Sequence, residues 1–343
     1  MHSENRRGKR VKNTRTLNKP YSIELLTEKV KNAKRAEGLA DGTLWNYQHA
    51  FNLLTEYLGY DDVRMLNVDV CRDFATWLLN DRVQFDGHKY KKETDKKRGL
   101  SPRTANDIIK TLRTAFRFLV GEGMLDYNPF ESVASIKQQE KIIDVLTVNE
   151  LKALLNAPDQ RSYAGFRDYV LMNVLIDTMA RINEILSLEV NDIDLHNRSI
   201  TLRPEVVKTR KGRFLNISKA TARLLKNLMD EVADFESEFI FLANYGEPLT
   251  SNHFRHRLVT YAKQVGIKKR VYPHLFRHTA ATMFLENGGD IRSLQIMLGH
   301  SDLRMTMKYT HLSRKAVTTQ HEQFSALNLI TDKLNKPRKI KRK

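Results

Sequence analysis

Apolar residues recur at helical spacing over most of the chain. In the segment 41–58, Tyr47, Phe51, Leu54 and Leu58 follow one another at intervals of four, three and four residues. These intervals place the four side chains on one side of an α-helix. The pattern therefore predicts an amphipathic helix that packs against a core.

A second helix is predicted over 101–120. Ser101 stands at a favourable N-cap position and Pro102 at the first helical position, where its missing N–H costs nothing. One side of this helix is apolar, through Ile108, Leu112, Ala115 and Leu119. The segment 84–100 before it is charged and contains glycine at both ends, which predicts an exposed loop.

The other side of the second helix carries a row of basic residues with one amide. The members of this basic row are Arg103, Asn106, Lys110, Arg113 and Arg117. Such a row suits a groove of DNA, where arginine, lysine and asparagine side chains meet phosphates and base edges. The alternative is a solvated helix face that binds nothing.

Apolar periodicity lapses after residue 126, where Pro129 and a polar run predict a linker near 131–143. The sequence then resumes with Thr147 as a helix cap and Glu150 three residues later, the spacing of a capping box. Further helix is predicted through 170–188.

The segment 198–218 alternates apolar and polar residues on both sides of the turn KTRKG, which predicts a short β-hairpin. From about 218 to 331 the pattern is helical again. The expected fold is mainly α with a small antiparallel β-sheet, in two domains. The predicted parts are a basic arm at 1–20, a helical domain at 21–130, the linker, a second domain at 144–331 and a basic tail at 332–343.

The charge of the chain points to a polyanionic partner. Lysine and arginine number 58 against 40 aspartates and glutamates, a formal net charge of +18. In proteins of this kind the partner is most often nucleic acid, although charge that merely keeps the protein soluble is the alternative. Cys71 is the only cysteine, and no apolar run approaches the roughly 18 residues of a membrane-spanning helix. A cytoplasmic protein is expected.

Two short motifs in the second domain contain candidate functional residues. Arg181 and Glu184 stand three apart near the start of a predicted helix, so Glu184 either holds a histidine or lysine in place or pairs with Arg181. Lys208 begins the predicted hairpin turn, where a long cation can reach a groove, and Lys211 is its rival.

Three further candidates follow. His274 and Arg277 stand three apart and share one face of a predicted helix, from which both reach the same phosphate. His300 follows Gly299, the expected end of a helix that Asp290 caps. The alternatives are chance placement in a basic protein and a histidine that only bonds the last helix carbonyls. Tyr309, one of twelve tyrosines, stands nine residues beyond His300.

Taken in order, these motifs resemble the tyrosine recombinase, or phage integrase, family. The resemblance covers nearly the whole chain and rests on ARINE, KTRKG, HLFRH, LGH and KYTHL, which contain Arg181, Lys208, His274, Arg277, His300 and Tyr309. The N-terminal half is similar to the helical core-binding domain of the family. Two departures are Met179, where the family commonly has glycine, and Phe276, where leucine is usual.

The resemblance implies that Tyr309 attacks a DNA phosphodiester, which forms a 3′-phosphotyrosyl link and frees a 5′-hydroxyl. A phenol of pKa near 10 needs about 4 kcal/mol of help to react as phenolate at neutral pH. His274 is the expected general base, with Glu184 as an orienting partner. Arg181 and Arg277 are expected to stabilise charge on the phosphate oxygens of the transition state.

Lys208 is then the expected general acid for the leaving 5′-oxygen, and His300 is expected to hydrogen-bond the phosphate. These side chains supply the positive charge that a metal ion gives to other nucleases. No metal or other cofactor is expected.

The family resemblance also implies partners. Strand exchange through a Holliday junction requires a homotetramer on two double-stranded DNA sites with inverted-repeat core sequences, with an accessory DNA-bending protein as an optional partner. A helix after Tyr309, with Phe324, Leu327 and Ile330 at helical spacing, either docks on a neighbouring subunit or folds back. The competing functions are a type IB topoisomerase and a DNA-binding factor without catalysis. The expected role is integration, excision or resolution of a mobile element.

Overall fold

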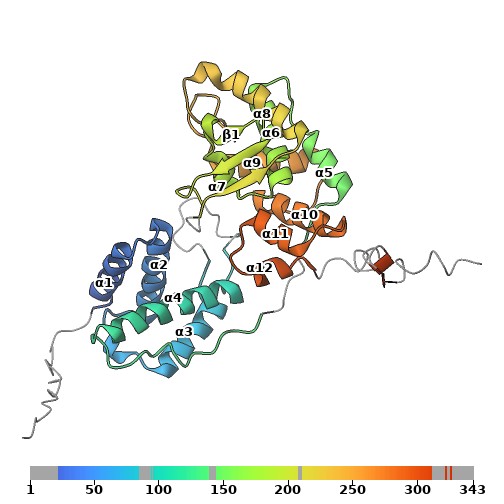
Figure 1. The fold of residues 1–343 in the computed structure, drawn as a ribbon. Helices are drawn as coiled ribbons and strands as arrows, with labels where there is room; N and C mark the ends of the chain where they lie inside the picture. The colour runs from blue at the N-terminus through green and yellow to red at the C-terminus, as the bar shows by residue number, and fades with distance from the viewer. Residues whose placement is uncertain are drawn as a thin grey trace, which may run out of the picture. The chain divides into compact units, whose positions relative to one another are not determined.

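The computed structural model describes residues 22–84, 94, 96–138, 144–207, 211–310, 321–322 and 325–326. The predicted arm at 1–20, the tail at 332–343, Lys208, and Phe324, Leu327 and Ile330 lie outside these described residues. By its internal contacts the chain divides into two compact units, Met1–Lys141 and Ile142–Lys343 (Figure 1). We describe each unit by itself.

The N-terminal unit is built from α-helices (Figure 1). Its elements are α1 (Ile23–Ala36), α2 (Asp41–Leu58), the 3₁₀ turn η1 (Val63–Met65), α3 (Val68–Asn80) and α4 (Pro102–Gly121). The helices enclose one apolar core, in which the rings of Phe74, Phe116 and Phe130 pack edge to face.

Both helices predicted for this unit are confirmed. Along α2 the side chains of Tyr47, Phe51 and Leu54 are buried. At the start of α4 the Ser101 hydroxyl accepts a hydrogen bond from the Thr104 N–H at 3.1 Å. The predicted apolar side of α4 is buried throughout, at Ile108, Leu112, Ala115 and Leu119.

The predicted linker begins later than its composition indicates, because its first residues pack on the N-terminal unit. Val133 is buried in the core of that unit. The Asn106 amide of α4 donates to the Ile136 carbonyl and accepts from the Ile136 N–H, both at 2.9 Å. Residues up to 136 therefore belong to the helical unit.

The C-terminal unit combines helices with a three-stranded sheet. Its helices are α5 (Val148–Leu155), α6 (Tyr163–Thr178), α7 (Ile182–Leu186), α8 (Lys219–Val232), α9 (Ser251–Gln264), α10 (Pro273–Glu286), α11 (Ile291–Leu298) and α12 (Arg304–Met307), with 3₁₀ turns η3 (Val190–Asp192) and η4 (Ala233–Phe235). The strands are β1 (Ile193–Asp194), β2 (Ser199–Leu202) and β3 (Arg213–Asn216), in the antiparallel order β1-β2-β3. Ile200, Leu202 and Leu215 point from the sheet into the core.

The predicted hairpin is confirmed as β2 and β3, with Ile200 opposite Leu215. The structure corrects one detail and adds a strand. The connection between the strands spans 203–212, longer than the predicted KTRKG turn. The additional strand β1, which contains Asp194, pairs with β2.

The helix predicted through 170–188 is present as two helices, because the chain breaks at Met179. Helix α6 ends at Thr178, and Met179 adopts the left-handed conformation with φ of 53°. Arg181 is then the N-cap residue of the short helix α7. Met179 thus has the conformation for which glycine is favoured, at the position where the family commonly has glycine.

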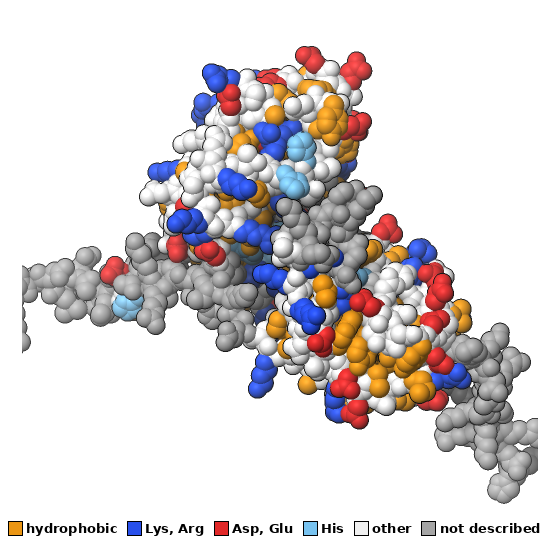
Figure 2. Space-filling model, turned by 180° about the vertical axis from the view of Figure 1, so that it is seen from behind, with side chains coloured by type: hydrophobic (Ala, Val, Ile, Leu, Met, Phe, Trp, Pro, Cys, Tyr) orange, Lys and Arg blue, Asp and Glu red, His pale blue; other side chains and the backbone are white. Residues whose placement is uncertain are grey.

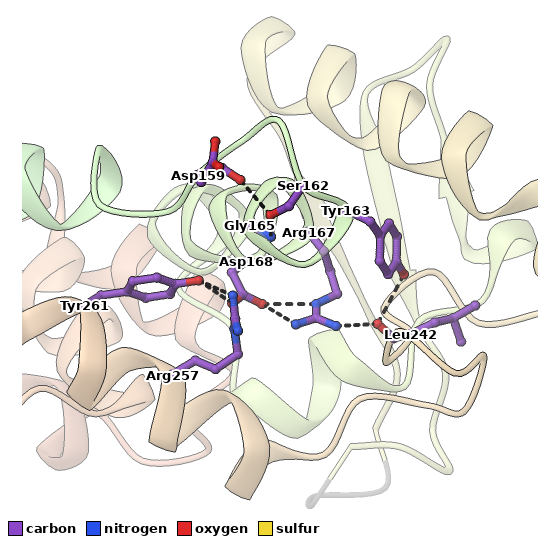
Figure 3. Close-up of polar contacts among 9 residues, drawn as sticks. All are labelled: Asp159, Ser162, Tyr163, Gly165, Arg167, Asp168, Leu242, Arg257 and Tyr261. Atoms are coloured by element: carbon purple, nitrogen blue, oxygen red, sulfur yellow. Dashed lines mark hydrogen bonds and ion pairs between the residues drawn. The ribbon is translucent and has the colours of Figure 1, made fainter.

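A buried polar network connects α6 with α9 (Figure 3). Arg167 and Asp168 are both fully buried, and the Arg167 Nη2 lies 2.8 Å from Oδ1 of Asp168. The other carboxylate oxygen of Asp168 accepts from Arg257 and, at 2.8 Å, from the Tyr261 hydroxyl. Arg167 also donates to the Leu242 carbonyl at 2.7 Å. This network fixes the helix that leads to Met179 and Arg181.

No helix in the described part of the chain combines the length and apolar character needed to cross a membrane. On the face seen in Figure 2, lysine and arginine side chains are spread over the surface of both units. This distribution accords with the formal net charge of +18.

Candidate active site

Arg181 and Glu184 form the first part of the site. At the start of α7 the Glu184 carboxylate accepts from the Arg181 backbone N–H at 2.9 Å and from Arg181 Nη1 at 2.9 Å. Helix geometry brings residues three apart together, so this contact is local. The predicted pairing of Glu184 with Arg181 is therefore present, while the Glu184 side chain itself is almost completely buried.

A second arginine also binds Glu184. Arg213, at the start of β3, places Nη2 2.7 Å from Oε2 and Nη1 3.2 Å from Oε1 of Glu184. Burial acts to raise the pKa of the Glu184 carboxyl, but the hydrogen bonds from Arg213 and Arg181 outweigh it and hold the pKa below its ordinary value. Arg213 is not among the residues predicted from the sequence, because nothing local distinguishes it from other strand residues.

Arg277 lies at the centre of the site and is buried. Its Nη1 donates to the Met179 carbonyl at 2.6 Å, and its Nη2 donates to the Leu298 carbonyl at 2.7 Å. The left-handed turn at Met179 therefore supplies one of the bonds that hold this guanidinium. Burial, together with the charge of Arg181, lowers the pKa of Arg277 to about 10.

His300 contacts Arg277 directly. Gly299 ends α11 in the left-handed conformation, as predicted, and His300 follows with Nε2 3.0 Å from Arg277 Nη2. An arginine side chain only donates, so Nε2 accepts and Nδ1 carries the proton, which it donates to the Thr306 hydroxyl at 3.0 Å. Burial, followed by the charge of Arg277, lowers the pKa of His300 to about 4. His300 is therefore neutral near pH 7.

Tyr309 completes the cluster. Its side chain is only 1% exposed, and its hydroxyl lies 2.9 Å from Nδ1 of His278. Burial raises the pKa of the phenol, while Arg277 and Arg181 act in the opposite direction. The ring belongs to an apolar cluster that includes Ala281 of α10 and Leu298 of α11. The predicted nucleophile is thus held within its own chain.

These contacts bring together five of the predicted residues, from four separate segments: Arg181, Glu184, Arg277, His300 and Tyr309. The set comprises two guanidinium groups, a neutral imidazole, a phenol and one carboxylate. Such a set leaves a local excess of positive charge, which suits an anionic group such as a phosphodiester.

Comparison with known proteins shows the family of this chain. A model of the phage integrase family matches residues 144–316, and a model of the phage integrase SAM-like domain matches residues 23–140. The chain belongs to the phage integrase family of tyrosine recombinases. It is accordingly a site-specific recombinase, an enzyme that breaks and rejoins DNA strands.

Individual relatives cover most of this recombinase. It is 30% identical to tyrosine recombinase XerD of Listeria innocua serovar 6a, over 84% of this chain and 94% of the relative. It is 32% identical to tyrosine recombinase XerC of Bacillus subtilis strain 168, over 79% of this chain and 94% of the relative. The fold matches the Tn1549 transposon integrase, solved with a circular intermediate DNA, with a TM-score of 0.69, 20% identity, and coverage of 89% of this chain and 100% of that one.

Two histidines of α10 lie differently relative to Tyr309 in this recombinase. His274, predicted as the general base, lies exposed on α10, and its pKa is lowered by partial desolvation and then by Arg277 and Arg181. His278, one turn further along, makes the contact with Tyr309. Its pKa is lowered to about 4, mainly by burial. The motif HLFRH already contained His278 as its last letter, but its spacing did not distinguish a role for it.

The expected general acid Lys208 lies outside the described residues. Its rival Lys211 is described and exposed. The recombinase structure therefore leaves the role of Lys208 as a prediction from the motif.

The basic row of α4 divides into two groups. Asn106 binds Ile136, as described above, and Arg113 donates to the carbonyls of Phe130 at 3.0 Å and Val133 at 2.7 Å. Their polar groups therefore hold the end of the helical unit together instead of pointing freely into solvent. Arg117 pairs with Glu131 at 2.6 Å on the surface, while Arg103 and Lys110 are exposed.

Proposed function

We propose that Tyr309 is the nucleophile of this recombinase and attacks a DNA phosphodiester bound by Arg181, Arg277 and His300. The observation that carries the proposal is the position of the phenol, whose hydroxyl lies 2.9 Å from His278 Nδ1. Burial raises the pKa of this phenol, and the nearby charges of Arg277 and Arg181 oppose that rise. In the reaction the phenolic oxygen bonds to phosphorus as the bond to the 5′-oxygen breaks. The product is a 3′-phosphotyrosyl link and a free 5′-hydroxyl.

Arg277 is suited to bind the phosphate because its orientation is fixed. The guanidinium has five N–H donors. Bonds to Met179, Leu298 and His300 hold its plane. The donors that these bonds leave over are available to the non-bridging oxygens, whose charge grows in the transition state.

Two proton transfers accompany the bond changes. His278 accepts the phenolic proton, because its Nδ1 lies 2.9 Å from the hydroxyl. His274 was expected in this role, but the contact at the hydroxyl favours His278. The leaving 5′-oxygen takes a proton from Lys208, a role that rests on the motif resemblance. The chemistry described here uses no metal or other cofactor.

The proposed substrate is double-stranded DNA with inverted-repeat core sites, exchanged within a homotetramer through a Holliday junction, with or without an accessory DNA-bending protein. Exposed Arg103 and Lys110 of α4 support a phosphate contact by the helical unit. Similarity to XerD and XerC and to a transposon integrase supports integration, excision or resolution of a mobile element. Because the two curated relatives are bacterial, we place the reaction in a bacterial cytoplasm.

The test is covalent capture on DNA. Inverted repeats that flank a short spacer beside the gene provide the site, and a nick near the cleavage position lets the 5′-terminal fragment diffuse away. The full chain is expected to accumulate a protein–DNA adduct that survives denaturation, whereas Tyr309→Phe accumulates none. An adduct formed by Tyr309→Phe would overturn the assignment, and Tyr245→Phe, at an exposed tyrosine, is the matched control.

A further inference from the structure

Arg213 connects the sheet to the predicted active site. It is the first residue of β3 and pairs with Leu202 of β2. From there its side chain reaches Glu184 through two hydrogen bonds, Nη2 to Oε2 at 2.7 Å and Nη1 to Oε1 at 3.2 Å. The parallel bonds between a guanidinium fork and a carboxylate fix both groups in direction as well as in distance.

Glu184 is shared between two arginines. Oε1 accepts from Nη1 of Arg181 and Nη1 of Arg213, and Oε2 accepts from the Arg181 backbone N–H and Nη2 of Arg213. The carboxylate side chain is only 2% exposed, so water does not replace a missing partner. If Arg213 were removed, Glu184 would lose two of its four bonds and would be free to rotate toward Arg181.

Arg213 also packs against the turn that carries His300. A Cβ atom built on Gly299 would lie 3.0 Å from Cζ of Arg213 and 3.1 Å from its Nε. The guanidinium therefore occupies the space that a side chain at residue 299 would need. Gly299 has a φ of +61°, which also favours glycine there. The Arg213 Nε is buried and has no hydrogen-bond partner in the described part of the chain.

Three segments thus meet at one side chain: β3, the start of α7 and the end of α11. Two of them carry groups that the proposed function assigns to the phosphate, Arg181 and His300. The Arg213 charge reaches this region as well, since it contributes to the lowered pKa values of Arg277 and His300.

We propose that Arg213 is a positioning residue. It acts through Glu184 to orient the Arg181 guanidinium, and through its contact with Gly299 to position His300. The proposal rests on the proposed function, in which Arg181 and His300 bind the scissile phosphate. Arg213 itself is bound to Glu184 and covered by Gly299, so it works without touching the DNA. Lysine cannot replace it, because an ammonium group has no fork to hold both carboxylate oxygens.

The experiment measures single-turnover cleavage by the full chain on two suicide substrates. One carries the natural phosphodiester, and the other carries a methylphosphonate at the cleavage position, which removes the charge of a non-bridging oxygen. Arg213→Lys is expected to slow cleavage of the phosphodiester by about a hundredfold, the cost of a misplaced group about 1 Å from its productive position. On the methylphosphonate, Arg213→Lys is expected to cause a much smaller loss of cleavage rate, and the same is expected of Arg181→Ala. The methylphosphonate lacks the charge that the arginine stabilises, so displacing or removing the arginine costs less.

The ratio of the two rates, measured on one preparation, does not depend on the fraction of folded protein. A variant that is partly unfolded therefore still reports on positioning. An equal loss on both substrates would overturn the proposal and leave Arg213 a purely structural residue. Arg203→Lys is the matched control, since Arg203 follows β2 in the same sheet and pairs with Glu189 at 2.6 Å. It is expected to leave the ratio unchanged.

A second measurement separates positioning from direct phosphate contact. In an Arg181→Ala background, Arg213→Lys is expected to add a much smaller loss than it causes alone, because one of the two groups that it positions is already absent. The full multiplicative loss in the double variant would overturn the positioning of Arg181 by Arg213. Failure of the proposed function is distinguishable, because then Tyr309→Phe would still form the adduct.

Discussion

Nδ1 of His278 lies 2.9 Å from the hydroxyl of Tyr309. The two residues come from α10 and from the segment after α12, and they are 31 positions apart in the chain. The contact links the proposed nucleophile to a neutral imidazole in the same subunit. Four predictions follow from this and related contacts, beyond the test of Arg213.

His278→Ala is expected to slow the first cleavage step by about a hundredfold at pH 7, the lower range of general-base effects. The deficit in cleavage rate is expected to shrink as the pH rises, because a growing fraction of the Tyr309 phenol then ionises without a general base. Single-turnover cleavage of the nicked substrate between pH 6 and 9 measures this. His196→Ala, at an exposed turn, is the control. A deficit that stays constant with pH would contradict proton acceptance by His278.

Acid is expected to destabilise the C-terminal unit through His278 and His300. Both have a folded pKa of about 4, below the ordinary value of 6.5. Between these values the unfolded chain binds more protons, so stability is present above pH 6.5 and is lost as the pH falls toward 4. Thermal unfolding is expected to show a lower Tm at pH 5 than at pH 7. His300→Asn is expected to reduce this difference, and an unchanged or larger difference would contradict the prediction.

The buried network of α6 is expected to contribute strongly to folding. Asp168→Asn leaves Arg167 and Arg257 without their shared carboxylate, and uncompensated buried charge costs about 3 to 5 kcal/mol. Chemical denaturation, followed by circular dichroism, measures the loss. Asp159→Asn removes an exposed ion pair with Arg161 and is expected to change stability little. Equal stability of the two variants would show that the Asp168 network is energetically neutral.

The basic row of α4 is expected to separate into structural and DNA-contacting members. Arg113→Ala removes bonds to Phe130 and Val133 and is expected to destabilise the helical unit by about 1 to 3 kcal/mol. Lys110→Ala is expected to leave stability unchanged. It is expected to reduce the slope of log DNA affinity against log salt concentration by about one, because about one counterion fewer is released on binding. Denaturation and fluorescence anisotropy at several salt concentrations measure the two effects. A larger stability loss in Lys110→Ala than in Arg113→Ala would reverse this assignment.

The sequence by itself determined those elements whose causes are local. The apolar stripe of α2, the Ser101 cap of α4, the capping box of Thr147 and Glu150, and the glycine end of α11 all depend on residues a few positions apart. The motif spacing also predicted Arg277, His300 and Tyr309 as site residues, and the structure brings the three together. Periodicity, capping and motif spacing can all be recognised in the sequence, because each involves residues that are close together along the chain.

Only the tertiary structure decided which side chains meet. Arg213 reaches Glu184 across 29 positions, and Asn106 binds Ile136 across 30. His278, instead of His274, contacts Tyr309, and the predicted helix breaks at Met179 to present a carbonyl to Arg277. Such contacts depend on how separate segments pack, and a short stretch of sequence does not contain the positions of its distant partners. Tertiary packing therefore brings motifs that are far apart in the sequence together into one cationic site, which contains a buried carboxylate.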